Sequence, residues 1–289
     1  STSITTKLET TLPASMSGHG WLIKLNKRLI YSISFFYNVS RSLADRILET
    51  ATKAGVQLLE SGAETFRVED TVCRICSTMH LEKPECFCMP TGLFTSVEYE
   101  GKVYTRVVRI KERKNDLEKI HLINDLSRHA GSLTIDEFEQ RLNLIIQPNP
   151  YNVYIDILFA SLGAFGFTFV FGGTIKDACF SFIIGSMIRS LMILLNKSKI
   201  NSFFINTFCS LILTSSALIL HKLNLTNDYE MVIIGTIMLL VPGLAITNAV
   251  RDSLAGDLVS GLARATEAIL IAVSVALGSG IAILLGGLL

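Results

Sequence analysis

The sequence has 289 residues, a mean hydropathy of +0.46 and a formal net charge of +1 at pH 7. This balance lacks the excess of basic residues that marks nucleic-acid-binding proteins, so no nucleic-acid partner is expected. The charges are unevenly distributed, because residues 1–154 hold 19 of the 26 Lys and Arg and 18 of the 25 Asp and Glu. This split predicts a soluble part followed by a membrane part.

The first 42 residues are expected to form an extension of the chain. Residues 1–20 are polar and rich in Ser and Thr, which predicts a mobile tail. Residues 21–39 carry basic residues before an apolar stretch. That pattern is typical of an amphipathic, interfacial helix, and a poorly ordered extension is the alternative.

Residues 43–150 read as a small α+β domain. Apolar residues recur at spacings of three and four along four segments, which predicts helices at 43–61, 66–79, 117–129 and 135–146. Thr134 and Glu137 form a capping box for the last of these helices. Between the second and third helices the residues become β-branched and aromatic, which predicts a β-hairpin of 87–99 and 102–110 around a turn at Glu100 and Gly101.

The start of the second helix concentrates charged residues. Four of them lie within about two turns, namely Glu64, Arg67, Glu69 and Asp70. One interpretation is a solvated helix face whose carboxylates stabilise the positive helix end. The other is a polar contact surface toward the membrane part or a substrate portal.

Four cysteines fall within 16 residues, as a C-x-x-C pair and a C-x-C pair: Cys73, Cys76, Cys86 and Cys88. Four thiols at this spacing could hold a tetrahedral zinc ion. However, the first pair lies in the middle of a predicted helix, and free cysteines commonly pack as small buried hydrophobes. We therefore favour packing, and we expect no metal and no cofactor.

The C-terminal part, residues 151–289, contains apolar runs of the length of a membrane span. Four runs carry no charge and a fifth is interrupted by Arg189 alone: 157–175, 178–196, 200–220, 231–250 and 268–289. About 20 apolar residues cross the bilayer core as a helix, so the sequence predicts five transmembrane helices. We expect Arg189 to extend toward the membrane surface.

The predicted fold class is thus an all-α membrane domain of five transmembrane helices, preceded by a small cytoplasmic α+β domain with a β-hairpin. The orientation follows from the loops. If the N-terminal domain is cytoplasmic, the loop with Lys197 and Lys199 is cytoplasmic too, as the positive-inside rule requires. The chain should therefore lie in the lipid bilayer as a multi-pass protein.

A polar segment, residues 241–268, separates two of the apolar runs. Pro242 lacks a backbone donor and Gly243 favours a bend, so we expect the helix to break there. Residues 251–267 then place polar and apolar side chains on opposite stripes of a helix. Broken helices at membrane depth expose backbone groups, and in transporters these groups bind ions and substrates.

Five polar side chains of this segment are candidate substrate ligands. Arg251 and Arg264 could each bind a substrate carboxylate, because a guanidinium group matches a carboxylate in two places. Asp252 or Asp257 could bind an ammonium group, and Asn248 could orient the substrate.

Two carboxylates, Asp257 and Glu267, are candidates to carry a coupling proton. Two other interpretations of the same charges stay open. The segment could be an interfacial helix with its charges in water. Its charges could also pair across subunits purely for assembly.

Two stretches together resemble the bacterial threonine/serine exporter family. They are "SGAETFRVEDTVCRI" at residues 61–75 and "PGLAITNAVRDSLAGDLVSGLARATEA" at residues 242–268. The order of helices, a hairpin with Pro90-Thr91-Gly92 and then membrane spans is also similar. The resemblance covers residues 43–289, although the clustered cysteines and the first forty residues depart from it.

The resemblance implies export of small metabolites across the inner membrane. Members of the family occur as one long chain with ten spans or as a split pair, and this chain looks like the larger subunit of a split pair. It therefore implies a small five-span membrane protein as partner, assembly into an oligomer, and a carboxylate-bearing substrate. That substrate would be threonine, serine or a dicarboxylate such as succinate.

An alternative is a membrane-anchored soluble domain with a hydrolase-like or metal-sensing role. The chain contains no G-x-S-x-G and no H-E-x-x-H motif, so an enzyme is not expected. It also contains no G-x-x-x-x-G-K-[ST] motif for ATP hydrolysis. Secondary transport is therefore the favoured function.

Overall fold

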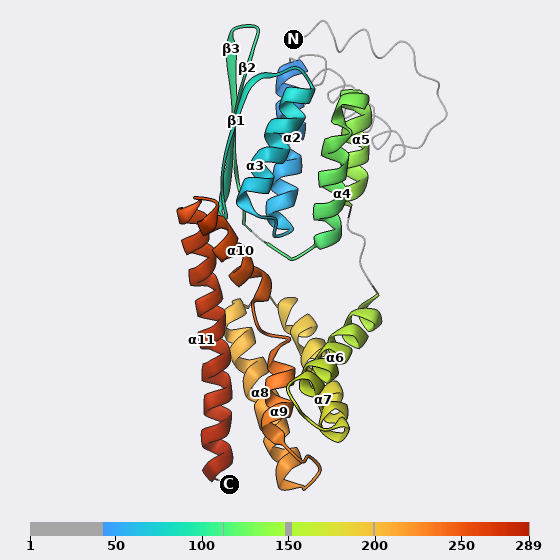
Figure 1. The fold of residues 1–289 in the computed structure, drawn as a ribbon, viewed down its shortest axis with the longest axis vertical. Coiled ribbons are helices and arrows are strands. Elements are labelled where there is room, and N and C mark those ends of the chain that lie inside the picture. The colour runs from blue at the N-terminus through green and yellow to red at the C-terminus, as the bar shows by residue number, and fades with distance from the viewer. Residues whose placement is uncertain (1–42, 112, 148–151, 199, 289) are drawn as a thin grey trace, which may run out of the picture.

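The computed structural model describes residues 43–111, 113–147, 152–198 and 200–288. An α+β part lies above a set of apolar helices, and the last helix, α11, runs along these helices and reaches the lower end of the α+β part (Figure 1). The predicted tail and interfacial helix of residues 1–42 lie outside the described residues.

The α+β part is built in layers. The sheet forms one layer, α2 and α3 cover one of its faces, and α4 and α5 pack behind them (Figure 1). Its core gathers buried side chains from every layer, among them Leu48, Ile75, Leu93 and Phe138. The helices are α2 (Leu43–Glu60), α3 (Thr65–Thr78), α4 (Leu117–Arg128) and α5 (Ile135–Ile146), with a short 3-10 helix η1 (Ala130–Ser132) between the last two.

These helices begin and end within a residue or two of the predicted positions. The predicted capping box is present, because the Thr134 side chain accepts a hydrogen bond from Glu137 N and the Glu137 carboxylate accepts one from Thr134 N. Local sequence signals therefore determine the helix ends in this part of the chain.

The predicted hairpin around Glu100 and Gly101 is confirmed, with Tyr99 opposite Lys102, but the strand predicted at 87–99 is divided, so the antiparallel sheet has three strands. The strands are β1 (Glu82–Met89), β2 (Gly92–Tyr99) and β3 (Lys102–Arg109), in the order β1-β2-β3. The predicted long strand is divided at Pro90 and Thr91, where the chain turns. Proline cannot donate a ladder hydrogen bond, and a turn accommodates it. The second turn is at Glu100 and Gly101, which both have positive φ angles.

The membrane part has fewer spanning helices than predicted. Among the described residues, four helices are long and apolar enough to cross a membrane. The expected span at 231–250 is instead two helices, of which α9 has nine residues, or about 13 Å, against a bilayer core of about 30 Å. The elements are α6 (Val153–Val170), α7 (Ile175–Asn196), α8 (Ser202–Lys222), α9 (Tyr229–Ile237), α10 (Gly243–Leu254) and α11 (Leu258–Leu288).

The interruption between α9 and α10 covers residues 238–242, and Gly243 is the first residue of α10. Hydropathy alone cannot detect such a break, because the uncharged run continues through it. Short α9 packs between α6, α7 and α8. Gly235 permits this packing, since any Cβ there would meet the backbone of Thr168 at 2.7 Å.

Arg189 does not extend freely toward the membrane surface. Its Nε and Nη2 atoms donate to both carboxylate oxygens of Asp156, at 2.8 to 3.2 Å. This fork-to-fork pairing joins α7 to the first turn of α6 and neutralises the charge that interrupts the second apolar run.

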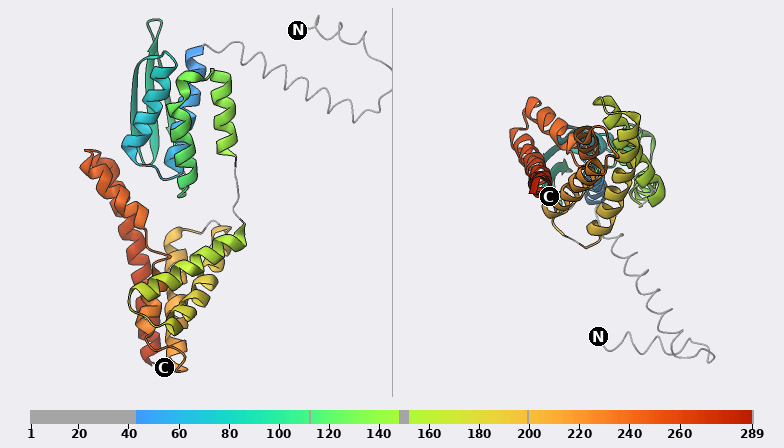
Figure 2. Two further views of the ribbon diagram at one scale, coloured as in Figure 1. Left: turned by 45° about the vertical axis from the view of Figure 1, so that its right-hand side comes forward. Right: turned by 90° about the horizontal axis from the view of Figure 1, so that it is seen from below.

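Helices α8 and α11 run parallel, and α11 is the longer of the two. Thr214 donates to Ser279 at 3.0 Å, and Gly286 packs against Leu218. The same register places Ser202, the first residue of α8, level with about residue 268 of α11, so about ten residues of α11, roughly 15 Å, extend beyond α8. Figure 2 shows this extension rising past the other membrane helices to the α+β part.

The contact of α8 with α11 depends on Gly278, and we predict that Gly278→Ala destabilises the protein. A Cβ at this position would collide with Ser210 Oγ and with the backbone oxygen of Thr207. Overpacking of this kind costs about 1–3 kcal/mol. The measurement is thermal unfolding of the purified chain in detergent.

Gly280→Ala is the matched control, because a Cβ at Gly280 meets no atom within 4 Å. Both substitutions gain the same helix propensity, so Gly280→Ala should be neutral or slightly stabilising. Equal unfolding temperatures for the two variants would contradict the described packing.

Candidate functional site

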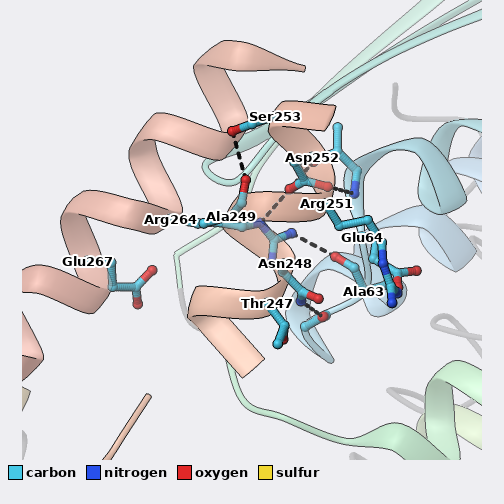
Figure 3. A network of polar contacts seen from close by, with 12 residues as sticks. Ala63, Glu64, Thr247, Asn248, Ala249, Arg251, Asp252, Ser253, Arg264 and Glu267 are labelled. Atoms are coloured by element: carbon cyan, nitrogen blue, oxygen red, sulfur yellow. Dashed lines mark hydrogen bonds and ion pairs between the residues drawn. The ribbon is translucent and has the colours of Figure 1, made fainter. Parts of the chain in front are cut away.

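The polar segment forms a helical hairpin of α10 and α11. A turn at residues 255–257 joins the two helices, with Gly256 at a φ of +97°. The helices approach closely at Gly261, where a Cβ would lie 2.9 Å from the backbone oxygen of Ala249. This hairpin presents its polar face to the loop between α2 and α3, residues 61–64 (Figure 3).

A buried ion pair lies at the centre of this contact. Arg264 Nε lies 2.9 Å from Asp252 Oδ2, and the two side chains are only 4% and 0% exposed. Asp252 also accepts hydrogen bonds from the backbone N–H and the hydroxyl of Thr65, each at 3.1 Å. Arg264 Nη2 donates to the backbone oxygen of Ala63 at 2.7 Å (Figure 3). Both charges are thus neutralised by the pair and tied to the α+β part.

Two further contacts surround the buried pair. Asn248 Nδ2 donates to the backbone oxygen of Gly62 at 2.9 Å. Arg251 pairs with the carboxylate of Glu64, which is also 2.6 Å from Arg67 Nε. The charges at the start of α3 therefore form a contact surface toward the hairpin. We call the whole set of contacts between residues 62–65 and α10–α11 the joint.

The other two charges of the α3 motif lie farther from the centre of the joint. Glu69 accepts a hydrogen bond from the backbone N–H of Cys88 at 2.8 Å. Burial raises the pKa of Glu69, and the nearby carboxylates of Asp257 and Asp252 add to this rise. Burial likewise raises the pKa of Asp257, with Asp252 contributing. Asp70 faces outward and pairs with Arg74.

The clustered cysteines lie where α3 packs on β1. Cys76 and Cys88 are buried, and burial raises the pKa of both Cys76 and Cys86 to about 12. Cys73 Sγ contacts the backbone oxygen of Pro84 at 3.5 Å. Within the described ranges no group of three or more His, Cys, Asp or Glu is arranged to hold a metal ion. The arrangement fits packing of neutral thiols.

One more ion pair crosses between the two parts of the molecule. Arg113 Nη2, in the segment between β3 and α4, donates to Glu267 Oε2 at 2.8 Å. These side chains are 28% and 45% exposed, so this pair is far more accessible than that of Asp252 and Arg264. Glu267, which is three residues from Arg264, is thus engaged by the α+β part.

A cavity of about 220 Å³ adjoins the joint. The three basic side chains in its wall are Arg113, Lys114 and Arg264, and its one acidic side chain is Glu267. The rest of the wall comes from the α2–α3 loop, the segment before α4, α8, the α9–α10 break and the two hairpin helices: Gly62, Asn115, Asn206, Leu240, Pro242, Ala245, Asn248 and Ile271.

The cavity separates the candidate residues into two groups. Asn248, Arg264 and Glu267 line it, whereas Arg251, Asp252 and Asp257 are not in its wall. Sequence reasoning missed the segment of Arg113, Lys114 and Asn115, and also missed Asn206. The basic residues at 111–114 were visible in the sequence, but nothing local indicated that they face the membrane helices.

We predict that Asp252→Asn destabilises the joint. Asparagine keeps the shape of the side chain but leaves the buried Arg264 without a counter-charge, and loss of one partner of a buried pair costs about 3–5 kcal/mol. Asp70→Asn, which removes an exposed partner of Arg74, should cost at most about 1 kcal/mol. Thermal unfolding in detergent would test this, and equally small losses would contradict it.

Comparison with known proteins gives a match over most of the chain. Residues 49–286 match the family model described as "Putative threonine/serine exporter". The chain is 23% identical over 243 residues to the "Probable succinate transporter subunit YjjP" of Escherichia coli (strain K12), which covers 82% of this chain and 93% of that protein. A protein of the same name from Klebsiella aerogenes is 22% identical, with 82% and 92% covered.

A third relative is longer. The "Probable threonine/serine exporter" of Mycobacterium tuberculosis is 21% identical over 238 residues, which is 81% of this chain but 45% of that protein. No solved structure gives a significant match. Together with the apolar helices, the family match identifies a multi-pass membrane transporter and not an enzyme. The chain belongs to the threonine/serine exporter family.

Proposed function

We propose that this chain is the larger subunit of a two-component secondary exporter, which moves a small carboxylic acid out across the inner membrane. In this proposal the α+β part is cytoplasmic, and the cavity beside the joint receives the substrate from that side. The observation that carries the proposal is the cavity's wall, with three basic side chains and one acidic side chain.

The place and size of the cavity support this role. It lies at the end of α8 nearest the α+β part, since Asn206 in the second turn of that helix belongs to its wall. Its volume of about 220 Å³ is many times the roughly 10–15 Å³ that a single water needs. A substrate there would meet the interrupted helix at Leu240 and Pro242, in the manner of transporters with broken helices.

The composition of the wall favours a small polar acid. Arg264 is neutralised by Asp252 and Arg113 is paired with Glu267, so a carboxylate would bind at Lys114 or compete for Arg113. Three amide side chains can hydrogen-bond a hydroxyl, amino or second carboxyl group: Asn115, Asn206 and Asn248. Leu240 and Ile271 supply apolar contact. Threonine, serine and succinate all fit this description, and the names of the relatives include all three.

The roles expected from the sequence are revised accordingly. We assign Asn248 and Arg264 to the substrate-facing wall, with Arg264 held in place by Asp252. Arg251 and Asp252 act in the joint, where they hold the hairpin against the α+β part. Asp257 and Glu267 are the proposed proton carriers, one in the hairpin turn and one in the cavity wall.

A protein partner is supported by the surface of the hairpin. Leu254, Leu258 and Leu262 are 84%, 67% and 70% exposed on the part of the hairpin that extends beyond α8. Lipid tails would not cover side chains that lie outside the bilayer core. More than half of the mycobacterial relative lies outside the match, and the enterobacterial relatives are named as subunits. A separate membrane protein, with five spans as the family resemblance implies, would cover this surface.

Efflux of labelled threonine and labelled succinate from proteoliposomes tests the proposal. We predict efflux when the chain is reconstituted with a small five-span membrane protein from the same organism, and little or none with the chain alone. The label that is exported identifies the substrate. Full efflux by the chain alone would contradict the two-component mechanism.

A substitution in the cavity wall tests its role in the same assay. Asn206→Leu replaces a polar group in the wall, so we expect at least a tenfold loss of efflux. Phe208→Leu is the control, because Phe208 lies on the same helix and is 48% exposed on its outer side. Unchanged efflux for Asn206→Leu would exclude this cavity from the pathway.

A further inference from the structure

The pair of Asp252 and Arg264 lies within the hairpin and is tied to the α+β part by hydrogen bonds from Thr65 and to Ala63, whereas the pair of Arg113 and Glu267 itself joins the α+β part to α11. Arg264 is engaged through Nε by Asp252 and through Nη2 by Ala63, and it is almost fully buried. Arg113 donates to Glu267 through Nη2 alone and is 28% exposed. Exposed ion pairs contribute little net free energy, whereas breaking a buried one is costly. The pair of Arg113 and Glu267 is therefore the one that can exchange its partner.

The segment that carries Arg113 is fixed at its base. Lys114 N donates to the backbone oxygen of Glu60 at 2.7 Å, and Asp116 N donates to that of Ser61 at 3.0 Å. These bonds hold residues 114–116 against the end of α2. Arg113 therefore reaches α11 with its side chain, and that side chain can change partner without movement of the anchored backbone.

Glu267 presents to Arg113 the same chemical group that the proposed substrate carries. Both side chains line the cavity, so a carboxylate that enters can approach the guanidinium that Glu267 engages. A guanidinium binds a carboxylate most strongly through two parallel hydrogen bonds, and Arg113 makes one to Glu267. A free carboxylate can adopt the two-bond geometry.

We propose that Glu267 occupies the place of a substrate carboxylate on Arg113, and that an arriving small carboxylic acid displaces it. This inference rests on the proposed function only for the identity of the acid. Displacement breaks the contact of Arg113 with Glu267 between the α+β part and α11. The hydrogen bonds around the buried pair of Asp252 and Arg264 still hold the hairpin against the α+β part. Arg113 thus becomes the residue that selects for a carboxylate.

Calorimetric titration of succinate and of threonine into the purified full-length chain tests the inference. Arg113→Gln should weaken binding at least tenfold, because it removes the cation that receives the carboxylate. Glu267→Gln should tighten binding about two- to fivefold, because it removes a competitor whose exposed ion pair is weak. Succinamide, which lacks the carboxylates, should not bind detectably.

The opposite signs distinguish competition from a merely structural ion pair, for which loss of either partner would act in the same direction. Lys111→Gln is the control, since Lys111 precedes Arg113 in the same segment but is not in the cavity wall. It should bind like the unaltered chain, and all three variants should unfold at similar temperatures.

Weaker binding by both Arg113→Gln and Glu267→Gln would overturn the inference, as would a lack of saturable binding of either acid to the unaltered chain. Because the readout is binding and not transport, failure of this inference can be distinguished from failure of the proposed function. Opposite shifts in affinity without efflux would support competition for Arg113 and refute export. Efflux together with shifts of the same sign would support export and refute the competition.

Discussion

The buried pair of Asp252 and Arg264 is the interaction on which the rest of the structure depends. Two charges withdrawn from water are tolerated only if each is neutralised and its remaining hydrogen-bonding groups are satisfied. Thr65 supplies two donors to the carboxylate and Ala63 supplies an acceptor to the guanidinium, while Arg264 Nε makes the 2.9 Å ion pair with Asp252 without an aligned hydrogen bond. The α2–α3 loop and the hairpin must therefore meet in one relative position.

That fixed contact explains how a cavity with a defined chemical character can exist between two different parts of a chain. Its basic residues come from both sides, Arg113 and Lys114 from the α+β part and Arg264 from α11. The cavity keeps this composition only while the joint holds the parts together. The interrupted helix contributes the remaining side, because α9 is too short to cross the bilayer and leaves Leu240 and Pro242 facing the cavity.

In the proposed mechanism Asp252 and Arg264 hold the two parts together, while Arg113 and Glu267 exchange partners. A contact made only of buried pairs would be rigid, and one made only of exposed pairs would be weak. Substrate entry would then alter the contact between the parts without separating them.

Features set by neighbouring residues could be predicted from the sequence. Helix positions in the α+β part followed from apolar periodicity, and the end of α9 lies close to the Pro242 and Gly243 that indicated a break. The polar character of residues 241–268 also identified the region of interest. Its chemistry was harder to assign, because Thr65 and Asp252 are 187 positions apart and no local pattern links them.

Two predictions failed because a helix break or a turn lies inside a stretch of uniform residue composition. The apolar run at 231–250 contains a helix break that leaves its hydropathy unchanged, so five spans were expected where four helices are long enough. The strand expected at 87–99 contains Pro90, and the turn there creates a third strand. Arg113 was missed because its role depends on where the α+β part contacts α11, which is a property of the tertiary structure.

The most direct test of the central claim, that the cavity beside the joint binds the substrate, is protection of an introduced thiol. Ala245→Cys places a cysteine in the cavity wall, and Leu254→Cys places one on the exposed surface of the same helix, α10. Labelling by a maleimide would be followed by mass spectrometry of the peptide concerned, with and without succinate or threonine. We expect one of these acids to slow labelling at position 245 and to leave position 254 unaffected. Equal labelling at position 245 with and without both acids would contradict a substrate site in this cavity.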